Sequence, residues 1–126
     1  AVASIQKRKG ILDFAKIAKE LKQYQFVWVG KISNIATLED REKIEKILKD
    51  KDSNIIFPGY LNGTELTGAY SAASVFVFPT HAETFGLVAV EAAAFGLPHH
   101  LYPKRWAEPT TPESCTAGPE NFPGRW

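Results

Sequence analysis

The chain has 126 residues, enough for one domain, of which 44% are hydrophobic and 23% charged, a composition typical of a globular protein with a buried core. Fifteen basic and fourteen acidic side chains leave a net charge of +1, which excludes a general attraction to nucleic acid or to an anionic membrane. The single cysteine excludes a disulfide framework and a cysteine-built metal site. With no apolar run of membrane-spanning length and no signal-peptide pattern, we expect a cytoplasmic α/β domain.

Strands and helices are predicted to alternate along most of the chain. In chain order we expect a strand at 2–5, a basic turn at 6–10, a helix at 11–21, a strand at 26–29, a helix at 37–48, a strand at 54–57, a helix at 62–72, a strand at 75–78 and a helix at 86–95. The run at 26–29 is continuously apolar, which predicts burial on both faces. Thr37 with Asp40, and Asn62 with Glu65, predict side-chain caps at two helix starts. This alternation indicates a parallel sheet with right-handed crossovers.

The last part of the chain differs in composition. Six of the eight prolines lie at or after Pro98, and residues 99–126 show neither the period of a strand nor that of a helix. Because proline cannot donate a ladder hydrogen bond, such a segment forms little regular structure. We therefore predict a folded α/β body at 1–98 and an irregular, proline-rich tail at 99–126.

The loop before the last predicted helix holds the most informative residues, because parallel α/β sheets bind ligands beyond the carboxyl ends of their strands. Glu83 lies in this loop, and Glu91 follows eight residues later in a helix that is otherwise small and apolar. A carboxylate there is costly unless something pairs with it. Between the two, free N–H groups near Phe85, Gly86 and Leu87 form a site for phosphate. Carboxylates that accept hydrogen bonds from sugar hydroxyls, beside backbone amides that bind phosphate, would suit a nucleotide sugar as the ligand.

The basic turn adds three cations, Lys7, Arg8 and Lys9, which follow the first predicted strand and face the same crevice. Together they could neutralise a diphosphate. A structural explanation is equally compatible with the spacing. In that case the basic turn is solvated, Glu83 interacts favourably with the dipole of the following helix, and Glu91 is solvated too.

Several stretches resemble one protein family. They lie at 9–12, 26–30 and 55–61, and above all at 83–92 and 96–98, where Glu-x7-Glu carries Phe-Gly before the helix and Gly-Leu-Pro after it. In register from Val2 to Pro98 they look like the C-terminal, donor-binding domain of the retaining GT-B glycosyltransferases of family 4, group 1. The amino-acid sequence at 8–10 and 57–60 is most similar to that of bacterial enzymes that glucosylate diacylglycerol. The resemblance implies a Rossmann-like parallel sheet flanked by helices, as part of a GT-B fold.

The resemblance also implies roles for the candidate residues. Glu83 would be the catalytic residue and contact hydroxyls of the donor sugar, while Glu91 would bind the ribose hydroxyls of the nucleotide. Lys9, with Arg8, would neutralise the diphosphate. The other donor contacts would be main-chain groups at Phe85, Gly86 and Leu87 for the diphosphate, and the turn Tyr60–Leu61 for the base. The implied reaction moves a hexose from a nucleotide sugar, a UDP-hexose, to a lipid or sugar acceptor with retention of configuration, without a catalytic metal or another cofactor.

The chain departs from the family pattern in two places. Ser4 stands where the family usually has an arginine, six residues before Gly10. After Pro98 the family continues with another apolar strand, which the residues from His99 onward do not resemble, and we expect the N-terminal acceptor domain to be missing. We therefore expect a fragment, inactive on its own, whose tail is a divergent ending or a frame-shifted translation. Its open sheet edge could support a homodimer.

Other functions remain as alternatives. The chain could be a nucleotide-sugar-binding module without catalysis, a GT-B-like sugar-nucleotide epimerase, or a flavodoxin-like interaction domain. The expected partners are the nucleotide sugar and the missing acceptor domain, with no nucleic acid. A peripheral membrane contact in the full enzyme could use the basic face that bears Lys16, Lys19 and Lys22.

Overall fold

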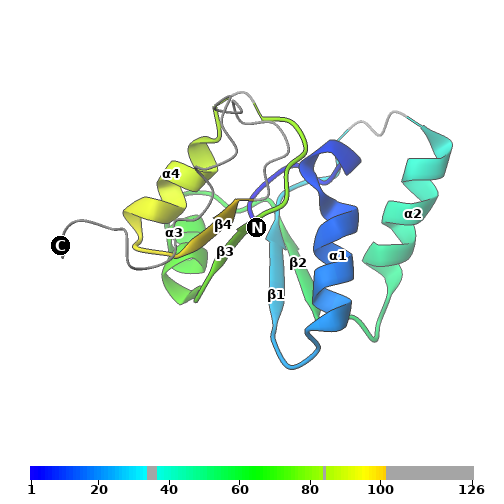
Figure 1. Cartoon of the computed structure of the whole chain (residues 1–126), viewed down its shortest axis with the longest axis horizontal. Coiled ribbons are helices and arrows are strands. Elements are labelled where there is room, and N and C mark those ends of the chain that lie inside the picture. The colour runs from blue at the N-terminus through cyan, green and yellow to red at the C-terminus, as the bar shows by residue number, and fades with distance from the viewer. Residues whose placement is uncertain (34–36, 84, 102–126) are drawn as a thin grey trace, which may run out of the picture.

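The computed structural model describes residues 1–33, 37–83 and 85–101 of the chain (Figure 1). In chain order its elements are the 3-10 helix η1 (Lys7–Lys9), α1 (Ile11–Glu20), β1 (Phe26–Val29), α2 (Leu38–Lys49), β2 (Ile55–Gly59), α3 (Gly63–Ala72), β3 (Phe76–Phe78), α4 (Leu87–Ala94) and β4 (His99–Leu101). The predicted alternation of helices and strands is confirmed, with shifts of a residue or two at several ends. The fold class is therefore α/β, as expected.

The strands form two parallel pairs, β1 with β2 and β3 with β4. The N-terminal segment runs parallel to β1, with isolated bridges from Val2 to Val29 and from Ile5 to Ile32. Val2 also packs against the hydrophobic cluster around Phe76. The N-terminal segment therefore lies between the two strand pairs, where Figure 1 places the N-terminus.

The predicted strand at 2–5 is not a continuous strand. The N–H of Ala3 donates to the carbonyl of Val29 (2.9 Å) and that of Ile5 to the carbonyl of Lys31 (2.8 Å), but only the two isolated bridges form. The neighbouring chain changes direction at Gly30, whose φ is +150°, and a Cβ there would lie 1.9 Å from the carbonyl oxygen of Ala3. The close approach at this glycine interrupts the regular ladder.

The first hydrophobic core lies between β1 and the helices α1 and α2. Its largest fully buried side chains are Trp28, Phe14, Ile11 and Ile44. The ring of Phe14 meets that of Trp28 edge to face at 5.0 Å, an arrangement that aromatic pairs favour. The predicted burial of β1 on both faces is confirmed at Val29, which is 3% exposed, and wrong at Val27, which is 37% exposed.

The second core joins α3, β3 and α4. Its buried residues are Tyr70, Phe76, Phe78, Ala92 and Leu97. Ala92 of α4 is fully buried in this core, and Val88 and Ala89 of the same helix pack against it. This core fixes α4, and with it Glu91, relative to β3 and α3.

Two predicted helix caps have different outcomes. Thr37 caps α2 as predicted, since its hydroxyl accepts the N–H of Asp40 at 3.2 Å. Asn62 occupies the cap position of α3, but its side chain makes no capping hydrogen bond. The second prediction is therefore right in position and wrong in the interaction.

The segment that follows Pro98 begins with a strand. β4 pairs in parallel with β3 from Phe76–His99 to Phe78–Leu101. The expectation of irregular chain from residue 99 is therefore wrong for His99–Leu101, and the edge of β3 that we expected to be open is paired. The ladder needs only three residues before Pro103, so the proline content of the whole segment does not prevent it. The rest of the predicted tail, 102–126, lies outside the described residues.

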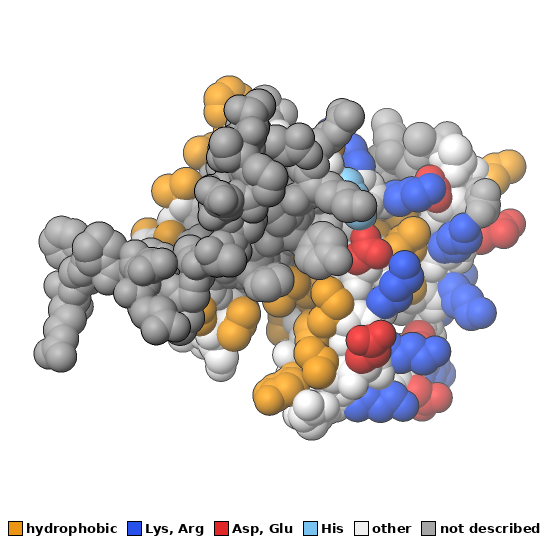
Figure 2. Space-filling model, viewed as in Figure 1, with side chains coloured by type: hydrophobic (Ala, Val, Ile, Leu, Met, Phe, Trp, Pro, Cys, Tyr) orange, Lys and Arg blue, Asp and Glu red, His pale blue; other side chains and the backbone are white. Residues whose placement is uncertain are grey.

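Charged and apolar side chains gather on different parts of the surface. Charged side chains cluster over α1 and α2 (Figure 2). In and just before α4, by contrast, the exposed side chains include the hydrophobic residues Phe85, Leu87 and Val90. The basic face of α1 is partly neutralised, because Lys16 pairs with Asp13 at 3.3 Å. Within the described ranges, no helix combines the length and the apolar character that a membrane span requires.

Candidate functional site

The basic turn folds into η1 and ends at Gly10, which also begins α1. Gly10 has a φ of +84°, a left-handed conformation that favours glycine. A Cβ at this position would lie 1.9 Å from the carbonyl oxygen of Pro79. Only glycine therefore allows the basic turn to pack directly against the loop that follows β3.

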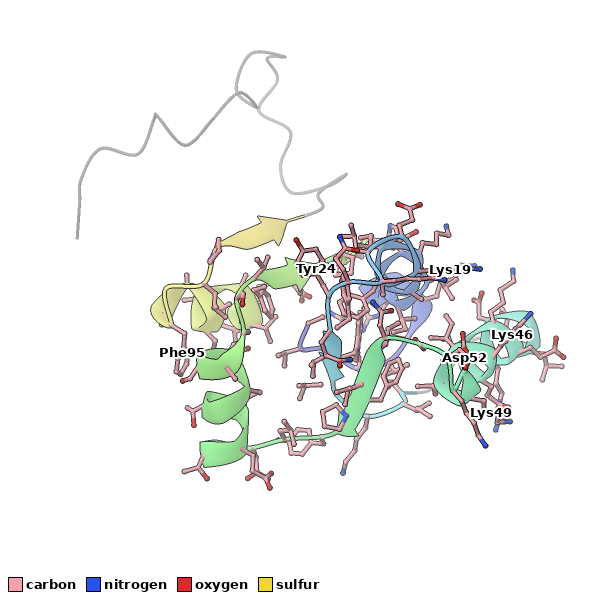
Figure 3. All side chains as sticks on the ribbon, turned by 90° about the horizontal axis from the view of Figure 1, so that it is seen from below. Lys19, Tyr24, Lys46, Lys49, Asp52 and Phe95 are labelled. Carbon is pink, nitrogen blue, oxygen red and sulfur yellow. The ribbon has the colours of Figure 1, made fainter. Side chains whose placement is uncertain are left out.

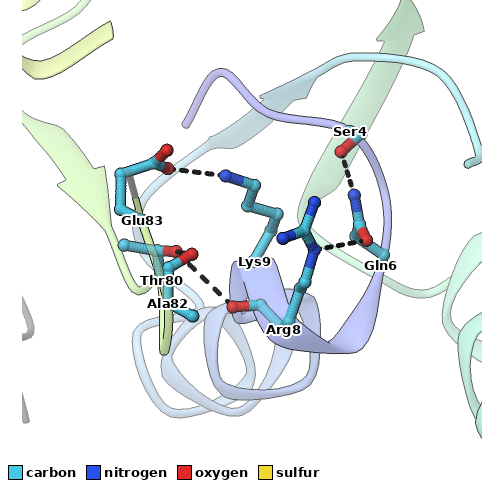
Figure 4. A network of polar contacts seen from close by, with 7 residues as sticks. All are labelled: Ser4, Gln6, Arg8, Lys9, Thr80, Ala82 and Glu83. Carbon is cyan, nitrogen blue, oxygen red and sulfur yellow. Dashed lines mark hydrogen bonds and ion pairs between the residues drawn. The ribbon is translucent and has the colours of Figure 1, made fainter. Parts of the chain in front are cut away.

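Lys9 and Glu83 connect these two loops. The Nζ of Lys9 lies 2.6 Å from the Oε2 of Glu83, and the two side chains are 14% and 15% exposed (Figure 4). A charge-assisted hydrogen bond between partly buried groups is stronger than a surface ion pair. Two predicted site residues, far apart in the sequence, are thus brought together as a pair.

The loop after β3 has further contacts with η1 and α1. The N–H of His81 donates to the carbonyl of Arg8 at 2.9 Å, and the Nε2 of His81 lies 2.6 Å from the Oδ2 of Asp13. The hydroxyl of Thr80 contacts the carbonyls of Ala82 at 3.1 Å and of Arg8 at 3.5 Å. Backbone and side-chain contacts therefore hold the part of the loop that directly precedes Glu83 against η1 and α1.

Arg8 is held by a neighbour that the sequence patterns did not single out. Its Nε donates to the Oε1 of Gln6 at 2.9 Å, and the amide of Gln6 donates to the hydroxyl of Ser4 (Figure 4). Ser4 is the position at which the resemblance led us to expect an arginine. Here the same position is linked, through Gln6, to the exposed guanidinium of Arg8.

The start of α4 is shaped by Gly86, which is buried and has a φ of +61°. Neither an acidic side chain in the first turn nor a side-chain cap occupies this end of the helix. The first turn of a helix carries N–H groups without intrahelical partners, and these favour anions. The flanking residues Phe85 and Leu87 are 75% and 67% exposed, whereas Gly86 between them is buried.

Glu91 is exposed, and its partner is Tyr70 on α3. The hydroxyl of Tyr70 donates to the Oε2 of Glu91 at 2.8 Å. Burial, and then the hydrogen bond to Glu91, raise the pKa of the Tyr70 phenol. Glu91 is therefore neither an unpaired buried carboxylate nor a freely solvated one, and Tyr70 is a site neighbour that the spacing of carboxylates could not predict.

Tyr60 and Leu61 follow β2 directly. The ring of Tyr60 is exposed, and the Nζ of Lys31 lies over it, 5.3 Å from the ring centroid, as in a cation–π contact. Leu61 is half-buried. The structure thus pairs Lys9 directly with Glu83, whereas Arg8 contacts the loop of Glu83 only through its backbone carbonyl. The contacts of Glu91 and Tyr60 are with other partners.

The fold and these loops define the class of the domain. Parallel strands alternate with helices. Except for Glu91, which lies within α4, the candidate residues are in turns, loops or a helix start that follow the strands, which is where Rossmann-like α/β domains bind their ligands. Comparison with known proteins agrees. Residues 1–99 match the family of group 1 glycosyl transferases, and the chain belongs to this family.

Three named proteins are similar to parts of this chain. The chain is 38% identical over 97 residues to the processive diacylglycerol alpha-glucosyltransferase of Acholeplasma laidlawii, a match that covers 77% of the chain and 28% of the relative. It is 35% identical over 94 residues to the alpha-galactosylglucosyldiacylglycerol synthase of Streptococcus pneumoniae, covering 75% and 25%. A sulfoquinovosyl transferase of Arabidopsis thaliana is 43% identical over 58 residues, covering 46% and 11%. The chain spans about a quarter of the length of the first two relatives.

Proposed function

We propose that the chain is the donor-binding part of a glycosyltransferase that moves a hexose from a nucleotide sugar, a UDP-hexose, to a lipid or sugar acceptor with retention. Membership of the group 1 family supports transfer, and the names of two relatives, both of which refer to diacylglycerol glycolipids, favour a lipid acceptor. The observation that carries the proposal is the Lys9–Glu83 pair. It places a cation and a carboxylate where two loops at strand ends meet.

At the diphosphate, Lys9 and Arg8 supply positive charge. The ammonium of Lys9 has three N–H donors, so it can bond Glu83 and still donate to a phosphate. Because Glu83 offsets the charge of Lys9, Arg8 adds the net positive charge that a diphosphate needs. The backbone N–H groups at Phe85, Gly86 and Leu87 would contact the same phosphates.

At the sugar and the nucleoside, carboxylates bind hydroxyls. Glu83, held in place by Lys9, would accept hydrogen bonds from the donor sugar and is the proposed catalytic residue. Glu91 would accept those of the ribose, and the turn Tyr60–Leu61 would lie beside the base. A carboxylate suits these tasks because each oxygen accepts hydrogen bonds from a hydroxyl.

The chemistry proposed for this site is electrostatic. The transition state of hexose transfer resembles an oxocarbenium ion, and negative charge grows on the departing diphosphate. Cations and helix N–H groups already oriented toward that charge stabilise it. Transfer also needs an acceptor held against the donor, a role that we assign to an N-terminal acceptor domain. We therefore propose that this chain alone binds donor without transferring the sugar.

Calorimetric titration tests donor binding. The purified chain is titrated with UDP, UDP-glucose and GDP, and the UDP titration is repeated with Glu91→Ala. We expect saturable binding of UDP that weakens about tenfold without Glu91, equivalent to about 1.4 kcal/mol. The matched control is Glu65→Ala, which removes an exposed glutamate of α3 and should leave the affinity unchanged.

Three outcomes would each count against a part of the proposal. Absence of binding by a chain that circular dichroism shows to be folded would refute the donor site. Equal binding by the wild-type protein and Glu91→Ala would refute the role of Glu91. Hexose transfer to diacylglycerol by the purified chain would contradict its proposed inactivity and leave the donor site standing.

A further inference from the structure

Tyr70 is the most constrained polar side chain near the candidate site. Only 3% of it is exposed, and its ring stacks on that of Phe95 at 5.3 Å with 14° between the planes. Phe76 packs on it at 5.9 Å. Figure 3 shows Phe95 beside α3, the helix that carries Tyr70. With its ring fixed by two aromatic neighbours, the position of the Tyr70 hydroxyl is fixed as well.

The hydroxyl has one proton to donate, and Glu91 is its acceptor at normal hydrogen-bond length. The distance to the Oε2 of Glu91 is 2.8 Å, whereas that to the carbonyl of Val88 is 3.5 Å, beyond the usual range for a hydroxyl donor. Because burial raises the pKa of this phenol, Tyr70 keeps its proton and remains a donor at neutral pH.

We propose that Tyr70 is a positioning residue, which holds the Glu91 carboxylate in the orientation that accepts the ribose hydroxyls of the nucleotide. The inference rests on the proposed function and adds a residue that acts only through Glu91. Glu91 is exposed on a helix of small side chains, where its three side-chain torsions would otherwise be free. Tyr70 fixes one carboxylate oxygen. The other oxygen, Oε1, accepts no hydrogen bond within the described part of the chain.

A fixed carboxylate recognises the two vicinal hydroxyls of a ribose better than a mobile one, since less side-chain freedom is lost on binding. The effect of Tyr70 on affinity should therefore depend on those hydroxyls. A merely structural role in the second core would alter the binding of every nucleotide alike. This difference separates the two explanations.

The experiment compares UDP with 2′,3′-dideoxy-UDP, which lacks both ribose hydroxyls, by calorimetric titration of the wild-type chain and Tyr70→Phe. We expect Tyr70→Phe to weaken UDP binding about fivefold, the effect of one lost hydrogen bond, and to leave the dideoxy nucleotide unaffected. Tyr24→Phe is the matched control, because the Tyr24 hydroxyl has no partner among the described residues. It should behave as the wild-type chain does.

Glu91→Gln provides a second variant in case Tyr70→Phe does not fold. Its amide oxygen can still accept from Tyr70, but its NH₂ group replaces the acceptor offered to the ribose. We expect Glu91→Gln to bind UDP no more tightly than the dideoxy nucleotide. A preference for UDP equal to that of the wild-type chain would overturn the inference.

The remaining outcomes distinguish the inference from the proposed function. If the wild-type chain prefers UDP and Tyr70→Phe keeps the full preference, the positioning role is refuted and the donor site stands. A wild-type chain that binds both nucleotides equally refutes the ribose contact of Glu91 and the role of Tyr70 with it. If the folded wild-type chain binds neither, the donor site itself is refuted, and the inference with it.

Discussion

Lys9 and Glu83 are 74 residues apart in the chain, yet their Nζ and Oε2 atoms lie 2.6 Å apart in a partly buried ion pair. The pair joins the turn that precedes α1 to the loop that precedes α4. Because both side chains are largely shielded from water, removing one partner leaves the other charge poorly solvated. The pair should therefore contribute to stability as well as to the candidate site.

We expect Lys9→Met and Glu83→Gln each to lower the free energy of unfolding by about 1 to 2 kcal/mol, because each removes a charge-assisted hydrogen bond between largely shielded groups. The double variant should lose less than the sum of the two, with a coupling energy of about 1 kcal/mol. Urea unfolding of the four proteins measures this cycle. Arg41→Met, which removes one partner of the exposed Arg41–Glu45 pair, should have a much smaller effect. A coupling energy near zero would refute a stabilising pair.

Gly10→Ala should be strongly destabilising. The new Cβ would lie 1.9 Å from the carbonyl oxygen of Pro79, in addition to the strain of a φ of +84°, so we expect a loss of more than about 2 kcal/mol in urea unfolding. Gly59→Ala is the control, because Gly59 has nearly the same φ, +85°, and a Cβ added there would meet nothing within 4 Å. It should lose only about 1 kcal/mol from strain alone. Equal losses of unfolding free energy in the two variants would show that the close approach of Pro79 is not what requires glycine at position 10.

The two helix caps provide a third test. Thr37→Ala removes a capping hydrogen bond to the N–H of Asp40 and should lower the unfolding free energy by about 1 kcal/mol. Asn62→Ala removes a side chain that makes no capping bond in the structure, so its effect should be clearly smaller. Thermal or urea unfolding of both variants measures the two losses of stability. A loss for Asn62→Ala as large as that for Thr37→Ala would mean that the Asn62 cap forms in solution.

The sequence predicted features that depend on neighbours along the chain, and one long-range contact that follows from the topology of a parallel sheet. Helical periodicity correctly placed Ile11, Phe14 and Ala18 on the buried face of α1. Strand ends in a parallel sheet meet at one edge, so the reasoning that placed the basic turn opposite the loop of Glu83 anticipated their contact.

What the sequence could not predict depends on partners distant in the chain. The exposure of Val27 reflects what covers one face of β1, which a continuous apolar run does not specify. Tyr70 was missed because helical spacing is read one helix at a time, whereas its partner Glu91 lies on a different helix. β4 was missed because three residues are too few for a period, and the pairing with β3 supplies the structure instead.

The ionisation of Tyr70 makes stability depend on alkaline pH. Burial, and then the hydrogen bond to Glu91, raise the pKa of its phenol above the ordinary value of 10.0, so the folded state favours the neutral form. The stability that this hydroxyl contributes is thus complete below about pH 10 and is lost as the pH rises further. In urea unfolding between about pH 8 and pH 11, the wild-type chain and the control Tyr24→Phe should lose stability more steeply than Tyr70→Phe, whose ring cannot ionise. Parallel pH profiles for all three proteins would show that Tyr70 titrates as an ordinary exposed tyrosine and that its hydroxyl is not held as described.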